Sequence, residues 1–72
     1  MMLHRVKEEG GRYYPQYRLF FIWMYISYIL DNKVYFDTNK EAAHFSNTIK
    51  GMPMYKWNSY IMSLIKNDKH FQ

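Results

Sequence analysis

The chain has 72 residues, no cysteine and a formal net charge of +4. This length fits one small domain, residues 1–72, and such a domain buries only about 60% of the surface that its unfolded chain exposes. Without cysteine, disulfides and thiolate zinc sites are excluded as sources of stability, and a reducing cytoplasm is the expected location. The positive charge favours an acidic partner, such as nucleic acid, a nucleotide or an acidic protein surface.

Aromatic residues make up 21% of the chain, with eight Tyr, five Phe and two Trp. Such rings either fill the core of a very small domain or form a binding face, because each Tyr and Trp offers a large apolar body with a polar group. Both readings stay open at this point.

The first half of the chain predicts strands. Residues Met2–Lys7 form a first strand, and Glu8–Gly11 form a turn. The next strand begins near Arg12, tolerates Pro15 as an edge or bulge position, and continues through Leu19–Leu30, a run rich in aromatic and β-branched residues. This run is shorter than the roughly 20 residues that a spanning helix needs, so we expect no membrane partner.

A turn at Asp31-Asn32 and a short strand at Lys33–Phe36 complete the predicted sheet. Thr38 and Glu41 then have the spacing of a capping box, which opens a helix. Gly51 stands at its end as a left-handed cap. The helix places three apolar residues on one face: Ala42, Phe45 and Ile49.

A second amphipathic helix begins near Pro53, because apolar residues recur at helical spacing after it: Met54, Trp57, Ile61, Leu64 and Ile65. The predicted fold is therefore α+β, a three-stranded antiparallel meander followed by two helices packed on the sheet.

The predicted strand at Leu19–Leu30 has large side chains on both faces, with Phe20, Ile22, Met24, Ile26 and Tyr28 on one and Phe21, Trp23, Tyr25 and Ile29 on the other. A sheet with one solvated face should alternate apolar and polar residues. Either the second helix wraps to the far face, or that face is an interface, for which a homodimer is the simplest cover.

The chain lacks the patterns of catalysis and metal binding. His4, His44 and His70 have neither metal-ligand spacing nor a nucleophile beside them. The position of the carboxylates Asp37 and Glu41 is explained by the helix N-terminus, where negative charge is favourable. We therefore expect no enzyme activity, no cofactor and no metal.

Residues Val34–Thr38 and Glu41–Ala43, with the aromatic strands around Trp23, resemble the strand-strand-strand-helix DNA-binding modules of tyrosine-integrase arm-binding domains and apetala-type plant domains. The resemblance covers residues 17–50. It implies a sheet that reads the DNA major groove with Arg and Trp on its exposed face. In size and composition the chain also resembles small bacteriophage accessory proteins for host takeover or anti-defence, which implies a host-cell cytoplasm and action by binding.

The leading hypothesis is a non-catalytic, phage-type inhibitor, expected to be homodimeric, that blocks a host or defence protein or sequesters a small nucleotide. Its partner-binding face is predicted to comprise Arg12, Tyr13, Tyr17, Arg18, Trp23, Tyr25, Tyr28, Lys33 and Lys56. The alternative is a nucleic-acid-binding module that stacks unpaired bases on Tyr13, Tyr17, Trp23 or Tyr25. A structural subunit of a larger assembly is a third reading.

Overall fold

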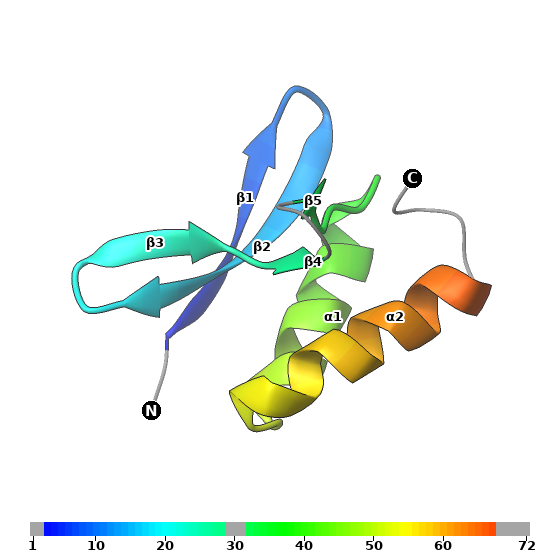
Figure 1. Cartoon of the computed structure of the whole chain (residues 1–72). Coiled ribbons are helices and arrows are strands. Elements are labelled where there is room, and N and C mark those ends of the chain that lie inside the picture. Colours follow the sequence, from blue (N-terminus) through cyan, green and yellow to red (C-terminus); the bar gives the residue numbers. More distant parts are fainter. Residues whose placement is uncertain (1–2, 29–31, 68–72) are drawn as a thin grey trace.

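The computed structural model describes residues 3–28 and 32–67. A three-stranded antiparallel sheet in the order β1-β2-β3 precedes two helices (Figure 1), which confirms the predicted α+β fold. The elements are β1 (His4–Glu9), β2 (Arg12–Leu19), β3 (Ile22–Tyr25), β4 (Ser27–Tyr28), β5 (Asn32–Lys33), α1 (Asn39–Lys50), the 3₁₀ turn η1 (Met54–Lys56) and α2 (Trp57–Asn67).

The predicted single strand at Leu19–Leu30 is wrong, because the chain reverses within it. Leu19 pairs with Ile22, so Phe20 and Phe21 form a two-residue hairpin turn. Phe20 has φ of 58°, the only positive φ among the described non-glycine residues. A two-residue turn in which φ is positive at the first central residue and negative at the second is of type II′, and its first central residue is usually glycine. The sequence carries no turn residue here, so composition alone suggested a continuous strand.

The prediction that Lys33–Phe36 forms the third strand of the sheet is also wrong, because β3 is the third strand and pairs with β2. β4 and β5 instead form a separate two-stranded sheet. Beyond it the chain returns to β2, where Phe36 and Tyr13 exchange two backbone hydrogen bonds of 2.8 and 2.9 Å. Several predicted features lie outside the described residues: the start of the first strand at Met2, the strand end at Ile29 and Leu30, the turn residue Asp31, and His70.

Pro15 lies in the central strand, a position where proline removes a ladder donor. On the β3 side, the N–H of Ile26 donates to the Pro15 carbonyl at 3.4 Å, but Pro15 has no N–H to return. The carbonyl of Ile26 accepts from Val34 instead, at 2.8 Å. The chain therefore leaves the three-stranded sheet to form β4 and β5 at the point where Pro15 of β2 lacks a backbone N–H.

The helix α1 has Thr38 as its N-cap, as predicted. The Thr38 hydroxyl accepts from the backbone N–H of Glu41 at 3.2 Å and lies 3.0 Å from the Glu41 carboxylate, to which it donates. At the other end, Gly51 has φ of −87°, so the predicted left-handed cap is wrong. Its N–H bonds to the Thr48 carbonyl three residues earlier, which tightens the last turn instead.

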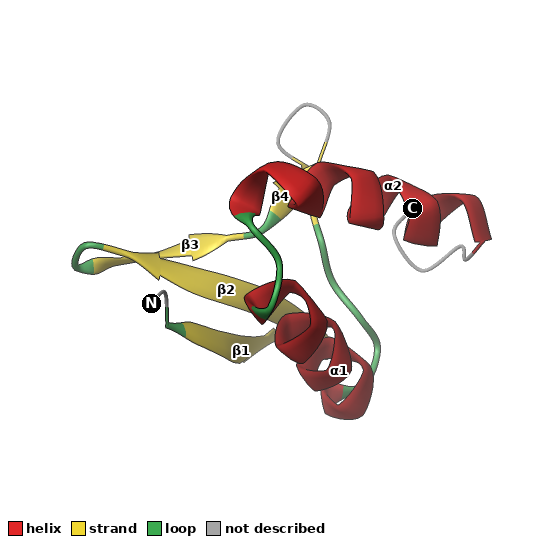
Figure 2. Ribbon diagram, turned by 90° about the horizontal axis from the view of Figure 1, so that it is seen from below, coloured by secondary structure: helices red, strands yellow, loops and turns green. Residues whose placement is uncertain are grey.

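Both helices lie toward the same face of the sheet, and the β2–β3 hairpin projects beyond them (Figure 2). α2 begins later than predicted, since Pro53 is followed by η1. The buried apolar core consists of Ile26, Val34, Phe36, Ala42, Phe45, Ile49, Trp57 and Ile61. None of the helices in the described ranges has the length and hydropathy needed to cross a membrane.

Candidate binding face

The face of the sheet opposite the helices, which we call the outer face, carries most of the sheet's cations. Side chains alternate along β1 and β2, and the pairs Arg5–Gln16, Gln16–Tyr25 and Arg18–Trp23 place these residues together. From β1, β2 and β3 the outer face comprises Arg5, Lys7, Glu9, Arg12, Tyr14, Gln16, Arg18, Trp23 and Tyr25.

Arg5 is held in place by two neighbours on this face. Its guanidinium carbon lies 4.2 Å from the centre of the Trp23 ring, and its Nε donates to the Gln16 side-chain oxygen at 2.6 Å. Gln16 is only 2% exposed although it lies on the outer face, because its neighbours cover it. Since Nε is occupied, the terminal amino groups of Arg5 are the donors that remain for a ligand.

Lys33 and Tyr25 form a second such pair. The Lys33 Nζ lies 3.9 Å from the centre of the Tyr25 ring, and the Tyr25 hydroxyl donates to Glu9 at 2.6 Å. This hydrogen bond is the main reason that the pKa of Glu9 is lowered and that of Tyr25 is raised. Through this hydrogen bond Glu9 orients the ring over which Lys33 lies.

Arg12 lies at the far end of the outer face, with its guanidinium carbon 4.3 Å from the centre of the Tyr35 ring. Its pKa is raised, first by a hydrogen bond with Tyr14 and then by electrostatic interactions that include Asp37. Glu9 pairs across the strands with Arg12, so both nearby carboxylates lie at this end. The end near the β2–β3 hairpin carries Arg5 and Arg18 and is the more basic one.

The predicted binding residues divide between two faces. Arg12, Arg18, Trp23, Tyr25 and Lys33 are brought together on or beside the outer face. By contrast, Tyr13, Tyr17 and Tyr28 are half-buried and pack against the core, and Lys56 lies in η1.

Sequence reasoning missed Arg5, Tyr14, Gln16 and Tyr35. The alternation of the first strand held the signal for Arg5, but its contact with Trp23 depends on the unrecognised hairpin. The Trp23 ring carries the Arg5 guanidinium on one side, and the Tyr25 ring carries the Lys33 ammonium on one side.

The tip of the β2–β3 hairpin exposes a group of apolar side chains, which we call the tip. Phe20 and Phe21 are 85% and 89% exposed, and Leu19 and Ile22 beside them are 45% and 63% exposed. Arg18 adjoins the tip, and its Nε donates to the Phe20 carbonyl at 3.0 Å. Exposed apolar groups of this kind mark interaction sites.

His4 lies on the helix side of the sheet, where its ring meets the edge of the Trp57 ring at 5.8 Å between centroids. Its Nδ1 is buried and has no hydrogen-bond partner among the described residues. Burial, and then the charge of Lys50, lower the pKa of His4. A neutral histidine packed on a tryptophan is a core feature, and it is separate from the outer face.

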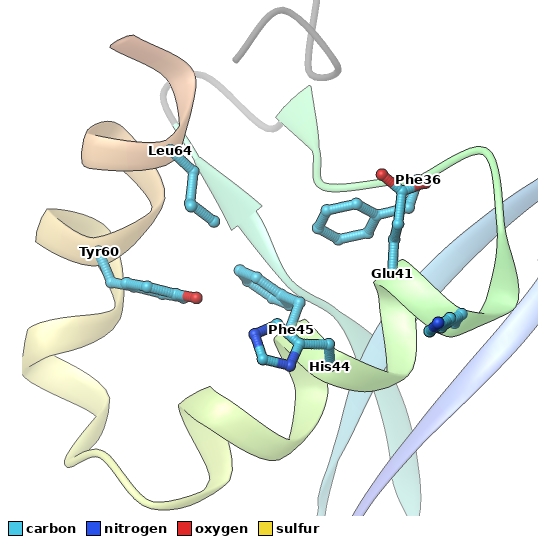
Figure 3. A pocket seen from close by; sticks show the side chains of 7 residues that line it. Phe36, Glu41, His44, Phe45, Tyr60 and Leu64 are labelled. Atoms are coloured by element: carbon cyan, nitrogen blue, oxygen red, sulfur yellow. The ribbon is translucent and has the colours of Figure 1, made fainter. Parts of the chain in front are cut away.

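A cleft of about 340 Å³ lies between α1 and α2 (Figure 3). The side chains of Phe36, Phe45, Tyr60 and Leu64 form its apolar walls, and Lys40, Glu41 and His44 of α1 also line it. Phe45 and Tyr60 are stacked, with centroids 5.7 Å apart. The cleft has room for a small apolar group, but its lining includes no hydroxyl or thiol nucleophile paired with a base.

Within residues 3–28 and 32–67, no three His, Asp or Glu side chains gather as a metal site would require. Comparison of the whole chain with protein-family models, curated proteins and solved structures finds no match. The inference of function therefore depends on the outer face and the tip.

Proposed function

We propose that this protein is a non-catalytic nucleic-acid-binding module that lays the outer face of its sheet on the phosphate backbone. The observation that carries the proposal is the position of three cations, each held over an aromatic ring. The distances to the ring centre are 4.2 Å for Arg5, 4.3 Å for Arg12 and 3.9 Å for Lys33. Cations that are already ordered lose less conformational entropy when they contact phosphate.

The arrangement favours backbone contacts over stacking of unpaired bases. Arg5 and Lys33 lie over the rings of Trp23 and Tyr25, so phosphate oxygens would meet cations before bases could reach those rings. Guanidinium groups suit this role because their N–H donors match the geometry of phosphate. The tip adds Phe20 and Phe21 at the basic end, where they would contact bases or sugars.

The test measures the binding of labelled duplex and single-stranded DNA by fluorescence anisotropy over a range of salt concentrations. A double variant, Arg5→Gln with Arg18→Gln, removes two cations from the outer face. The matched control, Lys40→Gln with Lys56→Gln, removes the same charge from exposed positions in α1 and η1.

Each phosphate contact that is lost should reduce the slope of log K against log salt by about 0.9 on a duplex. We expect the outer-face variant to lose affinity and slope, and the control to keep both. Equal losses in the two variants would show an effect of net charge alone, and absent binding by the wild type would refute the proposal. Circular dichroism confirms that each variant is folded.

A second candidate is the blocking of a host or defence protein, and the exposed tip is the observation that favours it. In that case, replacing Phe20 with Gly and Phe21 with Ser should abolish capture of the target, and the double Arg variant should retain it. Capture that depends on the arginines and falls with salt would instead support nucleic-acid binding.

A further inference from the structure

The outer edge of β3 has backbone groups that point away from the sheet. The N–H of Ile26 bonds to β2, and hydrogen-bonded positions alternate along an antiparallel pair, so Ile22 and Met24 also bond to β2. The N–H and C=O groups of Trp23 and Tyr25 therefore point outward. No backbone hydrogen bond to them from that side occurs among the described residues.

The residues of β3 itself lack the charge and the proline by which many edge strands resist pairing. β3 reads Ile-Trp-Met-Tyr, without a charged residue or a proline. The opposite edge of the sheet is β1, which reads His-Arg-Val-Lys-Glu-Glu and is protected by charge. Ile22 and Met24 are 63% and 37% exposed on the side of the helices, so the unpaired edge also has an uncovered apolar side.

We propose that β3 pairs with β3 of a second copy of this chain, antiparallel and about a two-fold axis at Met24. Trp23 then lies opposite Tyr25 of the partner subunit, and the two residues exchange both backbone hydrogen bonds. The two-fold axis generates a second, equivalent pair, in which Tyr25 lies opposite Trp23 of the partner subunit. The N–H and C=O groups of both residues are therefore all hydrogen-bonded on each copy. The same edge thus supplies its own complement, as an isologous interface requires.

The side chains on the helix side fit this arrangement. Met24 meets Met24 of the partner subunit, and Ile22 is covered by the added strand. Met24 also lines a cleft of about 330 Å³ with Met54 and Ile61, and the added strand would lie along it. The product is one six-stranded sheet whose two outer faces are continuous. Pairing does not depend on nucleic-acid binding, although it would double the number of available cations.

The first test uses the absence of cysteine, because Met24→Cys would give the only thiol in the chain. Directly opposite residues at a position of this kind have Cα atoms about 4.5 Å apart, within the range that a disulfide spans. We expect Met24→Cys to form a disulfide-linked dimer under mild oxidation. Glu8→Cys, an exposed control in β1 far from this edge, should form much less at the same concentration. Equal cross-linking of the two variants would overturn the proposal.

The second test needs no variant. Hydrogen exchange of the Trp23 and Tyr25 amides should slow as the concentration of the wild-type protein rises, and Met24→Lys should abolish this slowing by placing two like charges at the two-fold axis. Exchange that does not depend on concentration, with a monomeric mass throughout, would refute the pairing whether or not the protein binds DNA.

Discussion

The backbone of Phe20 leads to a prediction about stability that separates strain from the loss of a ring. Phe20→Gly and Phe20→Ala both remove an 85% exposed ring, so they lose the same small contacts. Only glycine also removes the Cβ, which is strained at φ of 58°. The two variants therefore differ by the cost of a left-handed residue.

The size of the difference follows from two opposing effects. A non-glycine residue in the left-handed region costs about 1–2 kcal/mol. Against this, glycine loses more conformational freedom on folding than alanine does, which lowers the stability of the glycine variant by about 0.5–1 kcal/mol. Phe20→Gly should therefore be more stable than Phe20→Ala by about 0.5–1 kcal/mol, or a few degrees in Tm.

Thermal and urea unfolding of the purified variants measure this difference. The control is Phe21, which has no positive φ, so Phe21→Gly should be less stable than Phe21→Ala. If alanine matched or exceeded glycine at position 20, the assigned turn geometry would be refuted.

Three further predictions concern the core and α1. Trp57→Phe removes the indole N–H that donates to two carbonyls at the end of α1, at 3.1 and 3.3 Å, and should destabilise the fold by about 1–3 kcal/mol in urea unfolding. Burial, and then the charge of Lys50, lower the pKa of His4 below its unfolded value, so stability should be lost as pH falls below about 6.5; His4→Gln should weaken this dependence more than His44→Gln does. Thr38→Ala should cost about 1 kcal/mol because it removes the N-cap acceptor, and Thr38→Ser should restore most of that stability.

The parts of the fold that the sequence predicted are those with local signals. Thr38 and Glu41 specify the start of α1 within four residues, so no knowledge of the remaining chain was needed. The hairpin at Phe20-Phe21 had no such signal, because its residues favour strands and one of them is strained. Phe20 is an exposed phenylalanine at a turn position that usually holds glycine, so it departs from the local preference of its backbone. Departures of this kind are expected at functional sites, and they are also the places where prediction from sequence fails.

The candidate site was predictable in composition but not in arrangement. Of the residues predicted to bind a partner, the cations Arg12, Arg18 and Lys33 lie on or beside the outer face. Tyr13 and Tyr17 were assigned with them, although both pack on the core, because the register of β2 was not known. The pairing of Arg5 with Trp23 joins β1 to β3 across β2, and it exists only once the hairpin has formed.

Pro15 gives the sheet a means to reject misaligned hairpins. A slip of β2 against β3 by two residues keeps every side chain on its own face, so hydrophobic burial hardly opposes it. In one direction the slip would, however, place the missing donor opposite Met24, and among the described residues no backbone N–H outside β2 bonds to the Met24 carbonyl as the Val34 N–H bonds to that of Ile26. An unpaired carbonyl costs about 1–3 kcal/mol where it is buried. A residue that donates no hydrogen bond thereby selects one alignment among several of similar hydrophobicity, and should shorten the search for it during folding.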